Sequence, residues 1–224
     1  MLKMKRLFIV PVAVAATLAG NAQVNAPSPQ GYIERGTLMY SDQNYQGAID
    51  QLTKAQSSTL TPSQREEARW FTAMSLLHSG DITEARRMLE DFAADYPTSA
   101  HRIDAAMAIA DCDFYQGHYL EALDRYESVD PSALDLYAAE DYSYRTAYCM
   151  MMLHDYDKAM TGFRSLEGVK RYADASKFYQ GYIYYASGDY AEAKRMLTSV
   201  DISAAPGNRA SYYLAQIAYI ERDY

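Results

Sequence analysis

A turn followed by the start of a helix recurs along this chain at a nearly constant interval. Its fullest form is Gly188-Asp189-Tyr190-Ala191-Glu192-Ala193. The bulky residues of successive copies lie 37, 37, 37, 34 and 34 residues apart, at Tyr45, Ile82, Tyr119, Tyr156, Tyr190 and Tyr224. Self-similarity at this period is typical of solenoids, in which each unit packs against its neighbours. We therefore expect an elongated array of repeats instead of one closed globule.

Each period contains two helical stretches joined by a turn that carries Gly, Asn, Asp or His. Apolar residues of the first period, from Tyr45 to Ala55, recur at three- and four-residue steps, which is the spacing of one helical stripe. Thr61-Pro62-Ser63 is typical of a helix start, because Thr can cap a helix and Pro suits an early position. We expect an all-α chain of about five helix pairs plus the first helix of a sixth. The pairs are predicted at 32–40 with 45–55, within 61–95, within 99–129, at 134–153 with 156–166 and at 172–186 with 190–200, and the last helix at 209–220.

Residues 1–22 have the three-part layout of a secretory signal peptide. Lys3, Lys5 and Arg6 precede an apolar run over residues 7–18, and small residues follow before Gln23. The run is shorter than the ~20 apolar residues of a membrane-spanning helix, which disfavours a retained anchor. We expect cleavage before Gln23, no stable membrane insertion afterwards and an exported location, in the periplasm or elsewhere in the cell envelope.

The remaining chain divides into a linker and the array. Residues 23–30 contain Pro27 and Pro29 and are predicted to be an extended linker. The array then covers residues 31–224. Tyr224 is the residue that should begin the partner helix of the sixth pair, and solenoids usually end in an atypical polar cap. We therefore expect the array to be truncated at its C-terminal end.

Charge argues against nucleic acid as a partner. The whole chain has 21 Lys and Arg against 29 Asp and Glu, a net charge of −8. Removing residues 1–22 takes away three basic residues and no acidic ones, which leaves 18 against 29, or −11. Nucleic-acid binding depends largely on neutralising phosphates, so a surface this acidic repels it.

A second pattern runs through the helix pairs. A small residue precedes an Ala by 12 positions and a large residue by 16, in the sets Gly36, Ala48 and Leu52; Ala73, Ala85 and Leu89; Ala110, Ala122 and Tyr126; Ala147, Ala159 and Phe163; and Gly181, Ala193 and Leu197. This pattern resembles the tetratricopeptide repeat. Small residues are needed there because the two helices of a pair cross closely. The usual Trp position is shifted by one residue, and in this respect the repeats resemble divergent exported bacterial members, including the outer-membrane barrel-assembly lipoprotein and the periplasmic Tol-Pal coordinator.

The resemblance implies a concave groove lined by the first helices of successive pairs. The residues that it places there, as a contact surface for a protein or peptide, are Trp70, Phe114, Tyr144, Tyr148, Phe178, Tyr182, Tyr185 and Tyr212. Tyr and Trp are frequent in binding hot spots because they combine a large contact area with a polar tip. The same helical spacing is also typical of a core stripe, so each residue fits either the core or the groove. Tyr182 and Tyr185 cannot both be buried beside their aromatic neighbours, and they are the favoured site.

No arrangement in the sequence indicates an enzyme. There is no Ser/His/Asp set, phosphate loop or nucleophile elbow, and Asp111 and Asp113 diverge on a helix. His78, His118 and His154 lie near turns without metal-ligand spacing, so neither a metal nor another cofactor is expected. We expect a non-catalytic protein-interaction scaffold of the cell envelope. The alternative is a glycan-binding module that uses exposed Tyr and Trp rings.

Two further expectations concern individual side chains. Cys112 and Cys149 lie 37 residues apart at equivalent repeat positions, and neighbouring helix axes are too distant for easy bridging, which favours two separate core thiols over a disulfide. The chaperone-binding members of the resembled family hold a terminal carboxylate with Lys, Asn and Arg. The matching positions here are aromatic or acidic, for example Asp104, Asp111 and Asp141, which disfavours that activity.

Overall fold

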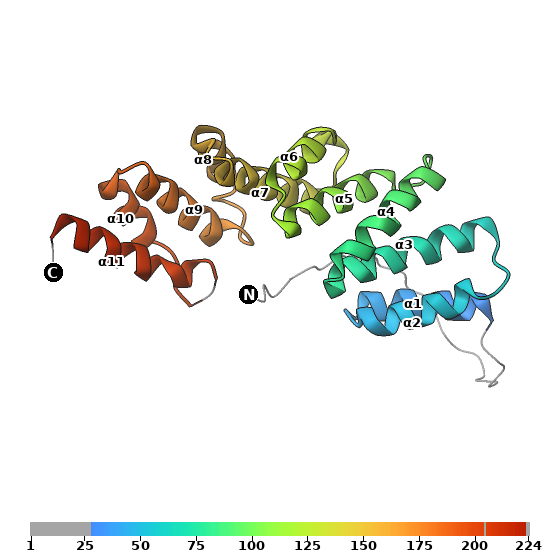
Figure 1. Ribbon diagram of the computed structural model, residues 1–224. Coiled ribbons are helices and arrows are strands. Elements are labelled where there is room, and N and C mark those ends of the chain that lie inside the picture. The colour runs from blue at the N-terminus through green and yellow to red at the C-terminus, as the bar shows by residue number, and fades with distance from the viewer. Residues whose placement is uncertain (1–27, 204, 223–224) are drawn as a thin grey trace. The chain divides into compact units, whose positions relative to one another are not determined.

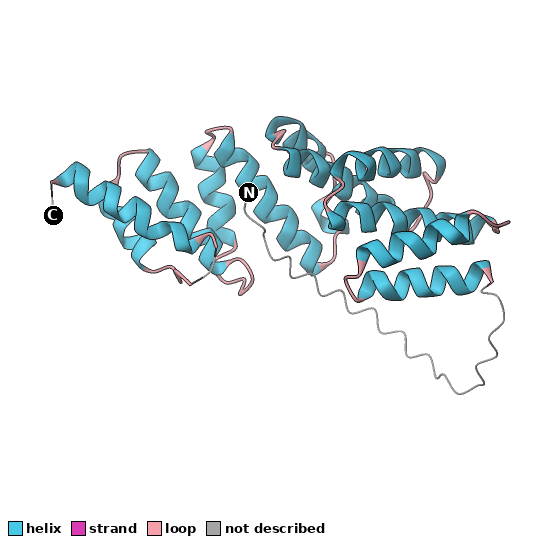
Figure 2. Ribbon diagram, turned by 60° about the horizontal axis from the view of Figure 1, so that its bottom comes forward, coloured by secondary structure: helices cyan, strands magenta, loops and turns pink. Residues whose placement is uncertain are grey.

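The computed structural model describes residues 28–203 and 205–222, and every regular element in these ranges is a helix (Figure 1; Figure 2). The first helices of the pairs are α1 (Pro29–Ser41), α3 (Pro62–Ser79), α5 (Arg102–Gln116), α7 (Leu136–Met152) and α9 (Ala173–Ala186). The second helices are α2 (Tyr45–Gln56), α4 (Ile82–Asp95), α6 (Tyr119–Glu127), α8 (Tyr156–Ser165) and α10 (Tyr190–Thr198). A sixth first helix, α11 (Ala210–Glu221), follows, and short 3-10 turns lie at Pro131–Ala133 and Gly207–Arg209. The expected α-solenoid of five pairs and one further helix is confirmed.

The start of the array differs from the prediction. Helix α1 begins at Pro29, because the Ser28 hydroxyl accepts a hydrogen bond from the Gly31 amide at 3.1 Å and Pro fits the first turn. The last two residues of the expected linker 23–30 are therefore helical. Residues 1–22, the rest of that linker except Ser28, and Tyr224 lie outside the described residues. Helix α7 also begins later than predicted, at Leu136, since Asp135 caps it by accepting from the Ala138 amide.

The recurring turn has a simple physical basis. Its first residue adopts a positive φ, which is 96° at Gly80 and 82° at Gly188. This left-handed conformation ends the first helix and suits Gly because Gly has no Cβ. The next residue caps the second helix: Asp81 accepts from the Glu84 amide and Asp189 from the Glu192 amide. The repeated phrase thus closes one helix and opens the next.

Close helix crossing explains the small residues of the repeat. A Cβ added to Gly36 would lie 2.5 Å from Leu52 Cγ, and one added to Gly181 would lie 2.8 Å from Leu197 Cγ. The alanines of the pattern are fully buried at all five positions, namely Ala48, Ala85, Ala122, Ala159 and Ala193. The two helices of each pair therefore approach too closely for a larger side chain.

The described residues form two compact units, which divide between Gln116 and Gly117. In the first unit, one core includes Ile33 and Leu52, and another includes Leu89 and Phe92. In the second unit, one core includes Phe163, Phe178, Leu197 and Ile217. Within the residues that the structure describes, no helix is long and apolar enough to span a membrane.

Candidate functional site

Aromatic rings form one connected cluster in the second unit. We call it the tyrosine cluster, and each member has a partner with ring centroids between 4.4 and 6.3 Å apart. Its members are Tyr119, Tyr144, Tyr148, Phe163, Tyr172, Phe178, Tyr179, Tyr182, Tyr185, Tyr190, Tyr212 and Tyr213. The first helices α7, α9 and α11 supply most of these rings, because their apolar stripes meet between successive pairs.

The floor of the cluster is buried. Phe163 and Phe178 are 0% and 1% exposed, and the Tyr179 ring stacks on Phe163 at 5.2 Å and meets Tyr148 edge-on. Burial raises the pKa of the Tyr144, Tyr148 and Tyr179 phenols, since a phenolate would lose its hydration there. These phenols stay neutral at ordinary pH and act as hydrogen-bonding groups.

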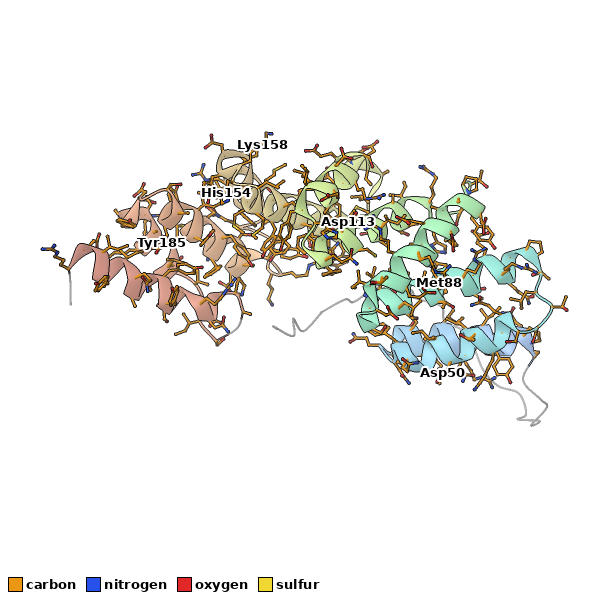
Figure 3. The ribbon with its side chains drawn as sticks, in the orientation of Figure 1. Asp50, Met88, Asp113, His154, Lys158 and Tyr185 are labelled. Carbon is orange, nitrogen blue, oxygen red and sulfur yellow. The ribbon has the colours of Figure 1, made fainter. Side chains whose placement is uncertain are left out.

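The rim of the cluster is partly accessible. Tyr148 of α7, Tyr182 and Tyr185 of α9, and Tyr213 of α11 are each half-buried. The Tyr213 ring lies 5.5 Å from that of Tyr182 and 5.2 Å from that of Tyr185, so neighbouring first helices share one aromatic rim. Figure 3 labels Tyr185 on α9. Half-buried rings are suited to binding because they are already positioned by packing.

An ion-pair network fixes one edge of the cluster. Arg171, just before α9, places its Nη2 atom 2.7 Å from Asp141 Oδ1 and 2.9 Å from Glu140 Oε2 on α7. The Tyr172 hydroxyl donates to Asp141 Oδ1 at 2.6 Å, and Arg145 Nη2 lies 3.6 Å from Asp141 Oδ2. The network holds Tyr172 where its ring stacks on Tyr144 at 4.4 Å. Asp141 is thus a structural carboxylate that neutralises nearby arginines.

The structure separates the eight predicted site residues into different environments. Six belong to the tyrosine cluster: Tyr144, Tyr148, Phe178, Tyr182, Tyr185 and Tyr212. Trp70 and Phe114 lie in the other compact unit. For those of the eight residues whose side chains are accessible, the assignment to a binding surface stays a prediction.

Trp70 and Phe178 are core residues, which corrects their placement on the surface of a groove. Trp70 is 6% exposed and stacks on His101 at 4.5 Å, and Phe178 is 1% exposed. The core alternative therefore applies to both. Phe114 is half-buried beside Tyr115, and Tyr212 is 62% exposed.

Six members of the tyrosine cluster were not among the predicted site residues, namely Tyr119, Phe163, Tyr172, Tyr179, Tyr190 and Tyr213, and neither was the adjacent Arg209. Tyr179 forms part of the floor, Tyr213 joins α9 to α11, and Arg209 lies over the Phe178 ring with its Cζ atom 5.3 Å from the centroid. Tyr179 directly follows Phe178, and Tyr213 directly follows Tyr212; both Phe178 and Tyr212 were predicted site residues. Arg209 has no signal in the repeat, since it precedes α11.

Asp113, Cys112 and Cys149, which were weighed as candidates for other chemistry, are buried side chains in the structure. Asp113, 1% exposed, forms an ion pair with Arg86, whose Nη1 lies 2.5 Å from Asp113 Oδ1. Cys112 and Cys149 are both buried thiols, as expected, and burial raises the pKa of Cys112 to about 12. In the described ranges, no group of three or more His, Cys, Asp or Glu side chains could hold a metal ion.

Comparison with known families agrees with this geometry. Two tetratricopeptide-repeat family models match the chain, at residues 67–91 and 175–200. The first match spans most of α3 and α4, and the second spans most of α9 and all of α10. These two segments match the tetratricopeptide repeat. No curated protein matches it.

Solved structures place the tetratricopeptide-repeat fold over nearly all of the chain. A Rap protein complexed with competence and sporulation factor is 19% identical with a TM-score of 0.56, over 87% of this chain and 58% of that one. MamA MSR-1 is 15% identical with a TM-score of 0.60, over 84% and 97%. The TPR-like repeats of a Podosopora anserina putative kinesin light chain are 17% identical with a TM-score of 0.57, over 86% and 96%. At these identities the likeness establishes the fold, and this chain spans 58% of the length of the Rap chain.

Proposed function

We propose that this chain is a non-catalytic protein-interaction module that binds a peptide or a protein segment on the tyrosine cluster of its second unit. The observation that carries the proposal is the shared rim of Tyr148, Tyr182, Tyr185 and Tyr213 over a buried aromatic floor. Rings held by packing lose little freedom on binding, so their contact area contributes to affinity at small entropic cost.

The tetratricopeptide-repeat fold supports this proposal. Helix pairs that stack side by side present successive first helices to one side, which suits a ligand that contacts several helices. The Rap protein that was solved in complex with competence and sporulation factor has a similar fold. We carry over from it only the use of such a fold for binding.

The proposal can be tested by selecting peptides from a random phage-displayed library on the immobilised full chain. Peptides enriched on the wild type are synthesised, and their Kd is measured by calorimetry. Replacing both Tyr182 and Tyr185 with Ala should weaken binding by tenfold or more, about 1.4 kcal/mol. Urea unfolding of the double variant establishes that it is folded.

Tyr184→Ala is the matched control, because Tyr184 lies on the same helix and contacts Arg164 through its hydroxyl at 3.0 Å. It should leave peptide affinity unchanged. Equal losses in the control and the double variant, or enrichment of no peptide on the wild type, would contradict the proposed site. Binding to dietary or envelope polysaccharides without any peptide would favour the glycan-binding alternative instead.

We further propose that the module works in the cell envelope. This rests on the sequence of residues 1–22, where basic residues precede a short apolar run and small residues. Expression in a Gram-negative host should give a mature protein that begins at Gln23 and is released with the periplasmic fraction. Mass spectrometry of the N-terminal peptide checks this. A retained Met1 in the cytoplasmic fraction would refute the exported location.

A further inference from the structure

Arg209 is an exposed cation at the edge of the tyrosine cluster. It ends the 3-10 turn Gly207–Arg209 and immediately precedes α11. Its guanidinium covers the buried Phe178 ring, and that ring lies 5.9 Å from Tyr213. One face of the guanidinium is thus in contact with an aromatic surface. The guanidinium also hydrogen-bonds the Tyr179 phenol, and the exposed side chain has further N–H donors for a ligand.

Two other arginines next to the cluster differ from Arg209 in having carboxylate partners. Arg171 pairs with Asp141 and Glu140, and Arg145 pairs with Asp141. Across residues 28–203 and 205–222, no carboxylate forms an ion pair with Arg209. Arg209 therefore carries a charge that no adjacent carboxylate neutralises.

Tyrosine hydroxyls lie around this charge. Burial raises the pKa of the Tyr148 and Tyr179 phenols, and the nearby Arg209 charge opposes that rise at both. Burial likewise raises the pKa of Tyr213, against the same opposing charge. A ligand group at Arg209 would thus have neutral phenols as hydrogen-bonding neighbours. The low polarity of the rings strengthens an ionic contact compared with open water.

We propose that Arg209 anchors an acidic side chain of the bound peptide, an Asp or Glu next to an apolar or aromatic residue that packs on the tyrosine rim. This inference rests on the proposed function and adds the chemistry of the partner. A carboxylate accepts two parallel hydrogen bonds from a guanidinium, which fixes its position as well as its charge. A polyanion is a poorer fit because the chain has a net charge of −8 and would repel it as a whole.

The same peptide selection tests the inference through specificity. Peptides enriched on the wild type should share an Asp or Glu at a fixed distance from an aromatic or large aliphatic residue. Peptides enriched on Arg209→Glu should carry Lys or Arg at that position instead. Replacing the acidic residue of a wild-type peptide by Gln or Asn should weaken its binding to the wild type about tenfold and its binding to Arg209→Gln hardly at all.

Lys177→Glu is the matched control for the charge change. Lys177 lies on α9, where it lines a different cleft of about 250 Å³ together with Arg164 and Gln180. Its reversal should leave the acidic preference intact. Urea unfolding of each variant separates loss of the fold from loss of specificity, since Arg209 also covers Phe178.

Three outcomes would overturn the inference. Wild-type peptides without an acidic preference would reject Arg209 as the anchor while leaving peptide binding in place. An acidic preference that survives in Arg209→Glu would assign it to another residue. Enrichment of no peptide, with or without binding to an acidic polysaccharide such as polygalacturonate, would reject both the inference and the proposed function.

Discussion

The phenol groups of Tyr144, Tyr148, Tyr172 and Tyr179 are largely removed from water, and burial raises the pKa of each above the ordinary value of 10.0. Tyr40 in the first unit has the same shift for the same main reason. In the unfolded chain these phenols ionise near their ordinary pKa, whereas in the folded chain they keep their protons to higher pH. The folded state is thus disfavoured once the solution is alkaline enough to ionise the unfolded chain.

This difference predicts alkaline destabilisation. The contribution of the neutral phenols to the free energy of unfolding is fully present below the ordinary pKa of 10.0. It is lost as the pH rises from there through the raised pKa values of the folded state. The free energy of unfolding, measured with urea at successive pH values, should be level to about pH 9 and then fall, with phenolate absorbance appearing together with unfolding.

Two Tyr→Phe variants sharpen this test. Tyr144→Phe should make the alkaline fall shallower, because it removes a buried phenol. Tyr219→Phe should not change it, because Tyr219 is 72% exposed. Unfolding free energy that does not vary up to pH 11, or equal effects of the two variants, would contradict the assignment of the effect to buried phenols.

The exposure of side chains at equivalent repeat positions was only partly predictable from the sequence. Phe178 and Tyr212 lie 34 residues apart at equivalent positions, yet Phe178 is 1% exposed and Tyr212 is 62% exposed. Arg209 and Tyr213 cover Phe178. Helix α11 has no following helix in the described residues to cover the corresponding side of Tyr212. Identical pattern positions therefore have different exposure according to which element follows.

At the scale of helices, the turn chemistry determined most boundaries. A residue with positive φ and a capping Asn or Asp at the start of the second helix make α2, α8 and α10 begin at the predicted residue. The first helices were less well defined. Their starts depend on Ser, Thr or Asp caps and on 3-10 turns, as at Pro131–Ala133 before α7.

The crossing of α9 and α10 gives a prediction for one side chain. Gly181→Ala should destabilise the protein by about 1–2 kcal/mol, because the new Cβ would lie 2.8 Å from Leu197 Cγ and the overlap outweighs the gain in helix propensity. Urea unfolding measures the change.

Gly168→Ala is the control for that substitution. A Cβ at Gly168 would meet no atom within 4 Å, so stability should change by no more than about 0.5 kcal/mol. If Gly181→Ala were neutral or stabilising while Gly168→Ala behaved as expected, the close approach of these two helices would be disproved.

At the scale of the molecule, the proposed function depends on each pair covering the apolar side of the next. In the second unit this stacking brings rings from α7, α9 and α11 into one cluster and leaves some of them half-buried. The proposed binding would therefore use side chains that also stabilise the fold. An affinity measured on a variant of this cluster therefore needs an unfolding measurement on the same variant.

The sequence alone determined the helical repeat, its turns and its small crossing residues, because these depend on local periodicity, capping and φ preferences that are written in neighbouring residues. Tertiary structure decided which aromatics are floor and which are rim, and it brought Arg209 onto Phe178 from outside the repeat pattern. The physical reason is that a helical stripe specifies direction, whereas exposure and charge pairing depend on what the neighbouring helices place opposite it.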